Sequence, residues 1–140
     1  MKKLVTLSLI LVTLIGCSAQ KGKDGNDGFT IIKKETYGGK ETKANVTITS
    51  QEQLYRLYSE LGIQEDAPTI DFSKKNVVAL FLGQKNTGGF TITVGSIEVK
   101  NDTATVRVLE TTPNGGMATM ALSAPYCIAS IPKTAKVVFK

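Results

Sequence analysis

The residues best suited to covalent chemistry in this sequence are two cysteines, Cys17 and Cys127, and the sequence contains no histidine. Without histidine the chain lacks the usual general base near neutral pH, the Ser–His and Cys–His nucleophile pairs, and the commonest metal ligand. Cys127 follows Tyr126 within an apolar stretch, where no adjacent base favours the thiolate. We therefore predict that Cys127 is a small buried hydrophobic residue. Exposure of its thiol would instead permit an intermolecular disulfide.

Carboxylates offer a second possible chemistry, because two of them at a defined separation in a cleft can act as an acid–base pair. Asp71, Glu98, Asp102 and Glu110 fall at loop or strand positions, where solvated surface charge is the ordinary role. Their positions in the sequence do not indicate that any two of them form an acid–base pair.

Residues 83–89 contain glycines and a lysine, but not in the order of a phosphate-binding loop. We predict that the chain is not an enzyme and that it holds no cofactor and no metal.

Cys17 lies in a pattern typical of bacterial lipoproteins. Two lysines at positions 2 and 3 precede an apolar run at 4–15, which is shorter than the roughly 20 residues of a membrane-spanning helix. Residues 14–17 (LIGC) resemble a lipobox, in which the cysteine thiol is acylated and the chain is cleaved just before it. We predict that 1–16 is a signal peptide and that the lipid on Cys17 binds the membrane. An uncleaved anchor or a buried first helix is the alternative.

Residues 17–28 are expected to form the lipidated cysteine and a flexible tether, because three glycines and mixed charges follow Cys17 without any large apolar side chain. The r.m.s. reach of such a tether is about 18 Å. Ser18 resembles the sorting signal that releases Gram-negative lipoproteins from the inner membrane. We predict a lipid-anchored cell-envelope protein, in the outer membrane of a Gram-negative bacterium. The choice between its periplasmic and surface faces stays open.

The charge balance does not indicate nucleic-acid binding. The sequence has 17 basic and 12 acidic residues, and loss of the two lysines of the signal peptide leaves 15 basic residues and a net charge of +3. Both signs are scattered along the chain, whereas a nucleic-acid interface needs cations clustered on one face. We predict no nucleic-acid partner. With 41% hydrophobic residues among 140, the composition is that of one globular domain, placed at 29–140.

The apolar patterning of 29–140 predicts a β-rich scaffold. Strands are predicted at 29–37, 46–48, 76–83, 90–94, 97–99, 105–109, 126–131 and 135–139. The run at 76–83 is continuous, which favours a strand buried on both faces. The strand at 46–48 is the expected partner of 29–37. Asn101 and Asp102 favour a hairpin turn.

One helix is predicted between the second and third strands. Ser50 and Gln53 have the spacing of a capping box, apolar residues follow at 54, 57, 58 and 61, and Gly62 marks the end. The apolar stripe is expected to pack on the sheet, because a short helix needs tertiary contacts. The predicted fold class is therefore α+β and mostly antiparallel: a small sandwich or open barrel of about six to eight strands with one amphipathic helix.

Two glycine-containing loops, at 83–90 and 112–117, are candidate binding elements, although glycine pairs also occur in simple tight turns. A proline–tyrosine pair shortly after the second loop is a third candidate. The candidate partner-binding residues are Asn86, Thr87, Gly88, Gly89, Phe90, Asn114, Gly115, Gly116, Met117, Pro125 and Tyr126.

The second half of the chain resembles a known family. This chain is similar to the C-terminal domain of the PrcB family. The similar residues of this chain are 71–73 (DFS), 77–83, 86–90 (NTGGF), Pro113 and 124–126 (APY). The phenylalanine at position 90 replaces the usual tyrosine of the family's Thr-Gly-Gly-Tyr motif. The family takes its name from a lipoprotein that assembles with a surface serine protease. The resemblance implies a lipoprotein assembly subunit with an unidentified envelope protein, such as a protease, as its partner.

A fainter resemblance is to chagasin-type inhibitors of cysteine peptidases, which present three loops at one end of an immunoglobulin-like sandwich. Residues 86–90, 114–116 and 124–126 follow the order of those loops. The first proline and the arginine of the inhibitor motifs are missing, and the last two loops are closer together in sequence.

These patterns favour a membrane-anchored, non-enzymatic protein-interaction module, and the PrcB resemblance suggests an accessory subunit of an envelope or surface protease complex. Two alternatives stay open: a peptidase inhibitor that uses the loops at 86–90, 112–117 and 124–126, or a structural envelope lipoprotein. Clustering of these loops at one end of the fold, with Phe90, Met117 or Tyr126 exposed, would favour binding or inhibition. The sequence does not indicate an oligomeric state.

Overall fold

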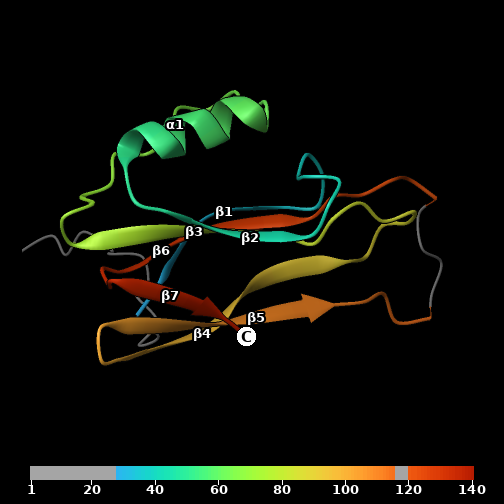
Figure 1. Ribbon diagram of the computed structural model, residues 1–140. Coiled ribbons are helices and arrows are strands. Elements are labelled where there is room, and N and C mark those ends of the chain that lie inside the picture. Colours follow the sequence, from blue (N-terminus) through green and yellow to red (C-terminus); the bar gives the residue numbers. More distant parts are fainter. Residues whose placement is uncertain (1–27, 116–119) are drawn as a thin grey trace, which may run out of the picture.

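The computed structural model describes residues 28–115 and 120–140, which form one helix and seven strands in three layers (Figure 1). The helix covers one face of a four-stranded sheet, and a three-stranded sheet covers the other face. In chain order the elements are β1 (Thr30–Glu35), β2 (Ala44–Ile48), α1 (Gln51–Glu60), β3 (Lys75–Phe81), β4 (Thr91–Lys100), β5 (Thr103–Thr111), β6 (Tyr126–Pro132) and β7 (Lys136–Phe139). The predicted sandwich with one helix is confirmed, and the two sheets do not close into a barrel.

The four-stranded sheet has the order β1-β6-β3-β2, and all its neighbouring strands are antiparallel. Its central strands are the most apolar: every side chain from Val77 to Phe81 in β3 is 0% exposed. Successive side chains of a strand point to opposite faces, so a strand can be apolar throughout only if both faces are covered. The predicted burial of the run at 76–83 on both faces is confirmed.

Two apolar cores lie on the two faces of this sheet. In β3, Val78 and Leu80 pack toward the three-stranded sheet, whereas Val77 and Phe81 pack toward α1. Burial of one such side chain stabilises the fold by about 1.5–3 kcal/mol. The buried residues between the sheets are Val78, Leu80, Leu82, Ile92, Val94, Ala104, Val106, Cys127, Ala129 and Ile131. The buried residues under the helix are Ile48, Leu54, Leu57, Tyr58, Val77, Ala79, Phe81, Tyr126 and Ile128.

The helix begins and ends where the sequence predicts. The backbone N–H of Gln53 donates to Ser50 Oγ at 3.3 Å, so Ser50 is the N-cap. The Gln53 side chain accepts from the backbone N–H of Thr49 at 2.9 Å, one residue earlier than in a standard capping box. After the last turn, Gly62 has a φ of +64°, which glycine adopts without steric cost.

The three-stranded sheet has the order β4-β5-β7. β4 and β5 form a hairpin across Asn101 and Asp102, whose φ angles of +50° and +56° fit the predicted two-residue turn. β7 pairs with β5 in parallel, unlike the antiparallel pairs formed by the other described strands. Asp102 helps to position β7, because its Oδ1 accepts from the backbone N–H of Ala135 at 3.0 Å.

Two sequence-based expectations about strands are wrong. The strand at 46–48 does not pair with the one at 29–37: β2 pairs with β3, β1 pairs with β6, and the two lie at opposite edges of the sheet. The strands β3 and β6 are apolar and buried on both faces, so they occupy the centre of the sheet. β1 and β2 therefore lie on either side of them. The segments 90–94 and 97–99 are one strand, β4, whose register shifts between Val94 and Ser96. The bulge there accommodates one extra residue without ending the strand.

Candidate functional site

Three connecting segments meet at one end of the sandwich, which we call the loop end (Figure 1). They are residues 36–43 between β1 and β2, residues 82–90 between β3 and β4, and the connection from β5 to β6, described at 112–115 and 120–125. The candidate loops of the sequence therefore cluster at one end of the fold. Loops held together on a rigid scaffold are a common place for recognition surfaces.

Backbone hydrogen bonds join the three segments of the loop end. The Gly39 N–H donates to Ala124 O at 2.9 Å, which links the first segment to the third. The Gln84 N–H donates to Glu41 O at 2.8 Å, which links the second segment to the first. These bonds fix the loops relative to one another, so the exposed side chains of the loop end have a shared frame.

The second and third segments also form a short antiparallel bridge. Lys85 and Ser123 exchange backbone hydrogen bonds of 2.7 and 2.9 Å. The Ser123 hydroxyl is 2.7 Å from Thr87 O, to which it donates, and Ser123 is 2% exposed. A buried hydroxyl needs such an acceptor. This hydrogen bond therefore satisfies the Ser123 hydroxyl and also holds the loop around Thr87 in place.

Gly89 allows the second segment to pass against Pro113. Its φ is +89°, and a Cβ added at this position would lie 2.8 Å from Pro113 Cβ. Any larger residue would combine backbone strain with a steric clash. The glycine of the Thr-Gly-Gly motif is therefore required by close packing of two loops.

The predicted binding residues differ in exposure. Asn86, Gly89, Asn114 and Gly115 are exposed, Thr87 and Phe90 are half-buried, and Gly88, Pro125 and Tyr126 are buried. Tyr126 is only 3% exposed and packs beside Phe81 beneath α1. Its ring supports the loop end from the core and does not face solvent. Gly116 and Met117 lie outside the described residues, as does Cys17.

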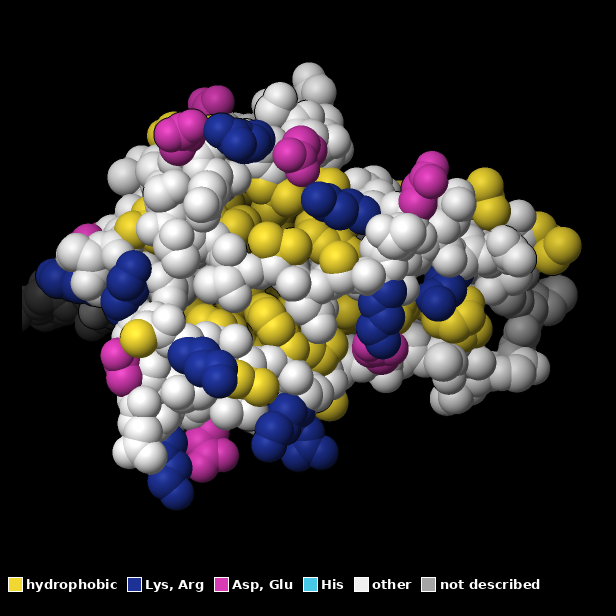
Figure 2. Space-filling view, viewed as in Figure 1, with side chains coloured by type: hydrophobic (Ala, Val, Ile, Leu, Met, Phe, Trp, Pro, Cys, Tyr) yellow, Lys and Arg dark blue, Asp and Glu magenta, His cyan; other side chains and the backbone are white. Residues whose placement is uncertain are grey.

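Sequence reasoning missed the most exposed apolar side chains of the loop end. Met120 is 90% exposed, Leu122 is 59% exposed, and Tyr37 in the first segment is 55% exposed. Figure 2 shows hydrophobic side chains at this end of the molecule, on the right of the view. Large apolar side chains that water surrounds on a fixed scaffold indicate an interaction surface. The available signal was two large apolar residues, at positions 120 and 122, in a loop rich in small residues.

Cys127 lies in the core between the two sheets, where it is 0% exposed, which confirms the predicted burial. Its Sγ is 3.8 Å from Thr93 Oγ1. Burial raises the pKa of the Cys127 thiol, so the reactive thiolate is disfavoured. This thiol is a packing residue.

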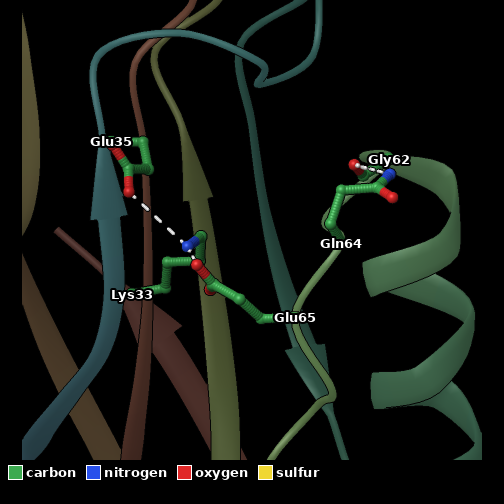
Figure 3. Close-up of polar contacts among 5 residues, drawn as sticks. All are labelled: Lys33, Glu35, Gly62, Gln64 and Glu65. Atoms are coloured by element: carbon green, nitrogen blue, oxygen red, sulfur yellow. Dashed lines mark hydrogen bonds and ion pairs between the residues drawn. The ribbon is translucent and has the colours of Figure 1, made fainter.

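A second polar cluster joins β1 to the segment that follows α1 (Figure 3). Lys33 Nζ lies 2.6 Å from Glu65 Oε2 and 3.5 Å from Glu35 Oε1. The hydrogen bond to Glu65 raises the pKa of the Lys33 ammonium. The Gln64 side chain donates to Gly62 O at 3.2 Å. The cluster lies in an open groove of about 350 Å³, and its Lys33–Glu65 ion pair links β1 to the segment that follows α1.

The carboxylates considered in the sequence do not converge. Asp71 Oδ1 accepts from the Ser73 hydroxyl at 2.5 Å and from its backbone N–H at 3.1 Å, and these bonds lower the pKa of the Asp71 carboxyl. Glu110 pairs with Lys43 at 2.5 Å. Residues 28–115 and 120–140 hold no group of three or more His, Cys, Asp or Glu side chains able to bind a metal. No helix in these ranges is long and apolar enough to span a membrane.

Comparison with known proteins identifies one family. Residues 76–132 match the model of the family described as PrcB C-terminal. The matched segment runs from β3 to β6 and includes the second and third segments of the loop end. No curated protein and no solved structure gives a significant match to the chain.

Proposed function

Because residues 76–132 belong to the PrcB C-terminal family, we propose that this chain is a non-enzymatic accessory subunit of an envelope or surface protease complex. It binds another protein of the envelope through its loop end. Its N-terminal cysteine, Cys17, carries the lipid that holds it at the membrane. The chemistry expected of this protein is recognition, with catalysis supplied by the partner.

One observation supports this proposal above the others: the loop end presents apolar side chains on a fixed frame. Met120 and Leu122 are exposed, while the adjacent Ser123 is buried and bonded to the second segment. Desolvation of large apolar side chains provides binding energy, and a preorganised surface loses little conformational entropy when it binds. Met120 and Leu122 lie within the family-matched segment.

The membrane anchor is supported by the sequence. The positive start, the short apolar run at 4–15 and the LIGC pattern all precede the described residues. A thiol-linked diacyl anchor would keep the domain within a short tether's reach of the lipid surface. The protein would therefore meet membrane-bound partners in two dimensions, at a high effective concentration.

Photo-crosslinking in cells tests the binding surface. We expect a photoreactive p-benzoyl-phenylalanine in place of Leu122 to capture one reproducible envelope protein. The matched control places the same group at Val99, which is 49% exposed near the β4–β5 turn, at the other end of the sandwich. Mass spectrometry of the adduct names the partner. The same group can also replace Met120 or Tyr37. Equal capture at Leu122 and Val99, or no capture at any of positions 122, 120 and 37, would contradict the proposal.

A peptidase inhibitor is the second candidate, and the clustering of 86–90, 112–115 and 124–125 at one end favours it. Such an inhibitor inserts a rigid loop edge into an active-site cleft. The burial of Tyr126 weighs against it, because this ring cannot reach a peptidase. Assays against papain-like and subtilisin-like peptidases at micromolar protein decide the matter. A lack of inhibition would leave the accessory role.

A further inference from the structure

Among the described residues, no strand pairs with the outer edge of β2. In residues 28–115 and 120–140, four strands have a free edge: β1 and β2 in one sheet, and β4 and β7 in the other. Free edges recruit other strands unless charge, irregularity or shortness prevents it. β1 has a register shift and the sequence TIIKKE, β4 has a register shift and ends in IEVK, and β7 has four residues and begins with lysine. β2 (ANVTI) has a regular register and no charged residue.

A groove of about 270 Å³ lies beside this edge, between β2 and α1. Its apolar lining is Val46, Ile48 and Leu57, and Val46 is 36% exposed. Figure 2 shows hydrophobic side chains between the helix layer and the sheet below it, bordered by basic and acidic side chains. Within the described part of the chain, the backbone edge of β2 is thus unpaired, and Val46 is the exposed apolar side chain beside it.

We propose that β2 pairs antiparallel with β2 of a second copy of this chain, which joins the two four-stranded sheets into one sheet of eight strands. A two-fold axis at Val46 places Ala44 opposite Ile48 of the copy and Asn45 opposite Thr47 of the copy. Because residues in a strand alternate between its faces, apolar side chains meet on the helix face and polar side chains meet on the other face. The five-residue pattern is therefore self-complementary.

Charges near the groove allow two copies to approach. Lys40 pairs with Glu60 at 3.4 Å, and Arg56 pairs with Glu52 at 3.0 Å. Two basic and two acidic side chains leave this rim neutral, so the two copies meet without net repulsion. β1 would be a poor alternative, because its register shifts between Ile31 and Lys33 and it places two lysines on the edge.

The segment that precedes the domain is a poorer occupant of the edge. Residues 18–27 (SAQKGKDGND) contain no β-branched and no large apolar side chain. They also lead into β1, at the opposite edge of the same sheet. A five-residue strand edge is small compared with the roughly 1,200–2,000 Å² of a standard interface. The dimer is therefore weak and reversible, and it does not involve the loop end.

Cysteine cross-linking of the full-length chain in the bacterial envelope tests the proposed pairing. In the Val46→Cys variant, the two thiols lie at the two-fold axis, and directly opposed Cα atoms about 4.5–5.5 Å apart are within disulfide range. We expect a reducible dimer of twice the chain mass, several-fold more abundant than in the parent chain. The matched control is Ile31→Cys, because Ile31 is 39% exposed on the β1 edge. Both variants replace exposed residues, and circular dichroism verifies their folding.

Mixed variants test the register. Asn45→Cys and Thr47→Cys chains, expressed together, should cross-link to each other more than either cross-links to itself. A Val46→Cys adduct with a different protein, equal cross-linking of Ile31→Cys, or a folded Val46→Cys chain that stays monomeric would each overturn the proposal. None of these outcomes bears on the loop-end partner, which the experiment at Leu122 tests separately.

Discussion

At the residue scale, glycine in the loop end has a packing role that the sequence pattern alone does not distinguish from a turn role. Gly89 has a positive φ and lies against Pro113, whereas Gly62 has a positive φ with no atom near the position of an added Cβ. A side chain at either position would therefore strain the backbone, but only a side chain at position 89 would also clash with a neighbouring loop. Substitutions at the two positions therefore separate the cost of backbone strain from the cost of the clash with Pro113.

We expect Gly89→Ala to destabilise the fold by about 1–3 kcal/mol, because it adds both φ strain and a clash with Pro113. Gly62→Ala should cost about 1 kcal/mol, from backbone strain alone. Urea unfolding followed by circular dichroism gives both values. Equal losses for the two variants would show that Pro113 moves away freely and that the contact between the loops is loose.

Burial also decides which side chains of the candidate motif remain available. Phe90 is half-buried with Lys85 Nζ 5.6 Å from its ring centre, and Tyr126 is buried under α1. Burial raises the pKa of the Tyr126 hydroxyl, so it stays neutral in ordinary buffers. The two aromatic residues thus pack within the fold, and the exposed large apolar side chains of the loop end are those of Tyr37, Met120 and Leu122.

At the element scale, α1 depends on both its cap and its tertiary contacts. Leu54 is 0% exposed and Leu57 is 6% exposed, so the apolar stripe is almost fully covered by the sheet. Ser50 satisfies a backbone amide that no helical carbonyl can reach. A ten-residue helix would be marginal without these contributions.

We expect Ser50→Ala to lower the free energy of unfolding by about 1 kcal/mol, the usual cost of losing an N-cap side chain. Ser59→Ala is the matched control, because Ser59 is an exposed residue within the same helix. Alanine has the higher helix propensity there, so the control should be neutral or slightly stabilising. Chemical denaturation measures both. If Ser50→Ala proved as neutral as the control, the hydrogen bond to Gln53 would contribute nothing.

β2 shows how one element can serve the fold and still be available to another chain. One edge pairs with β3 along all five of its residues, and the other edge lies beside the groove at α1. The register of β2 with β3 has no bulge, and an edge without a bulge is more available for pairing on its free side.

At the scale of the whole molecule, the predicted anchor and the proposed binding surface involve different parts of one chain. The predicted tether ends at Gly28 and enters β1, at the edge of the four-stranded sheet. The loop end is formed by connections between strands of both sheets. Loss of the lipid should therefore change where the protein is found without changing how it folds.

We expect Cys17→Ser to abolish incorporation of labelled palmitate and to release the chain from the membrane fraction, because the proposed lipid is attached through this thiol. Cys127→Ser is the matched control, since its thiol is buried and should not be acylated. Labelling in cells followed by fractionation measures both variants. Continued palmitate labelling of Cys17→Ser would contradict the proposed anchor.

The sequence alone determined the features whose causes are local. The cap at Ser50, the apolar spacing of 54, 57 and 58, and the turn at Asn101 and Asp102 all act within a few residues, so they could be predicted correctly. The continuous apolar run in β3 also indicated burial on two faces before its neighbours were known. The resemblance that identifies the PrcB segment depends on the same local motifs.

Only the tertiary structure decided which strands are neighbours and which loop residues reach solvent. β1 and β2 are separated because β3 and β6 bury more apolar surface in the centre of the sheet than at its edge. Tyr126 is covered by a helix that lies far from it in sequence, whereas Met120 is 90% exposed. Exposure is a property of contacts between distant segments, and no pattern within one segment encodes it.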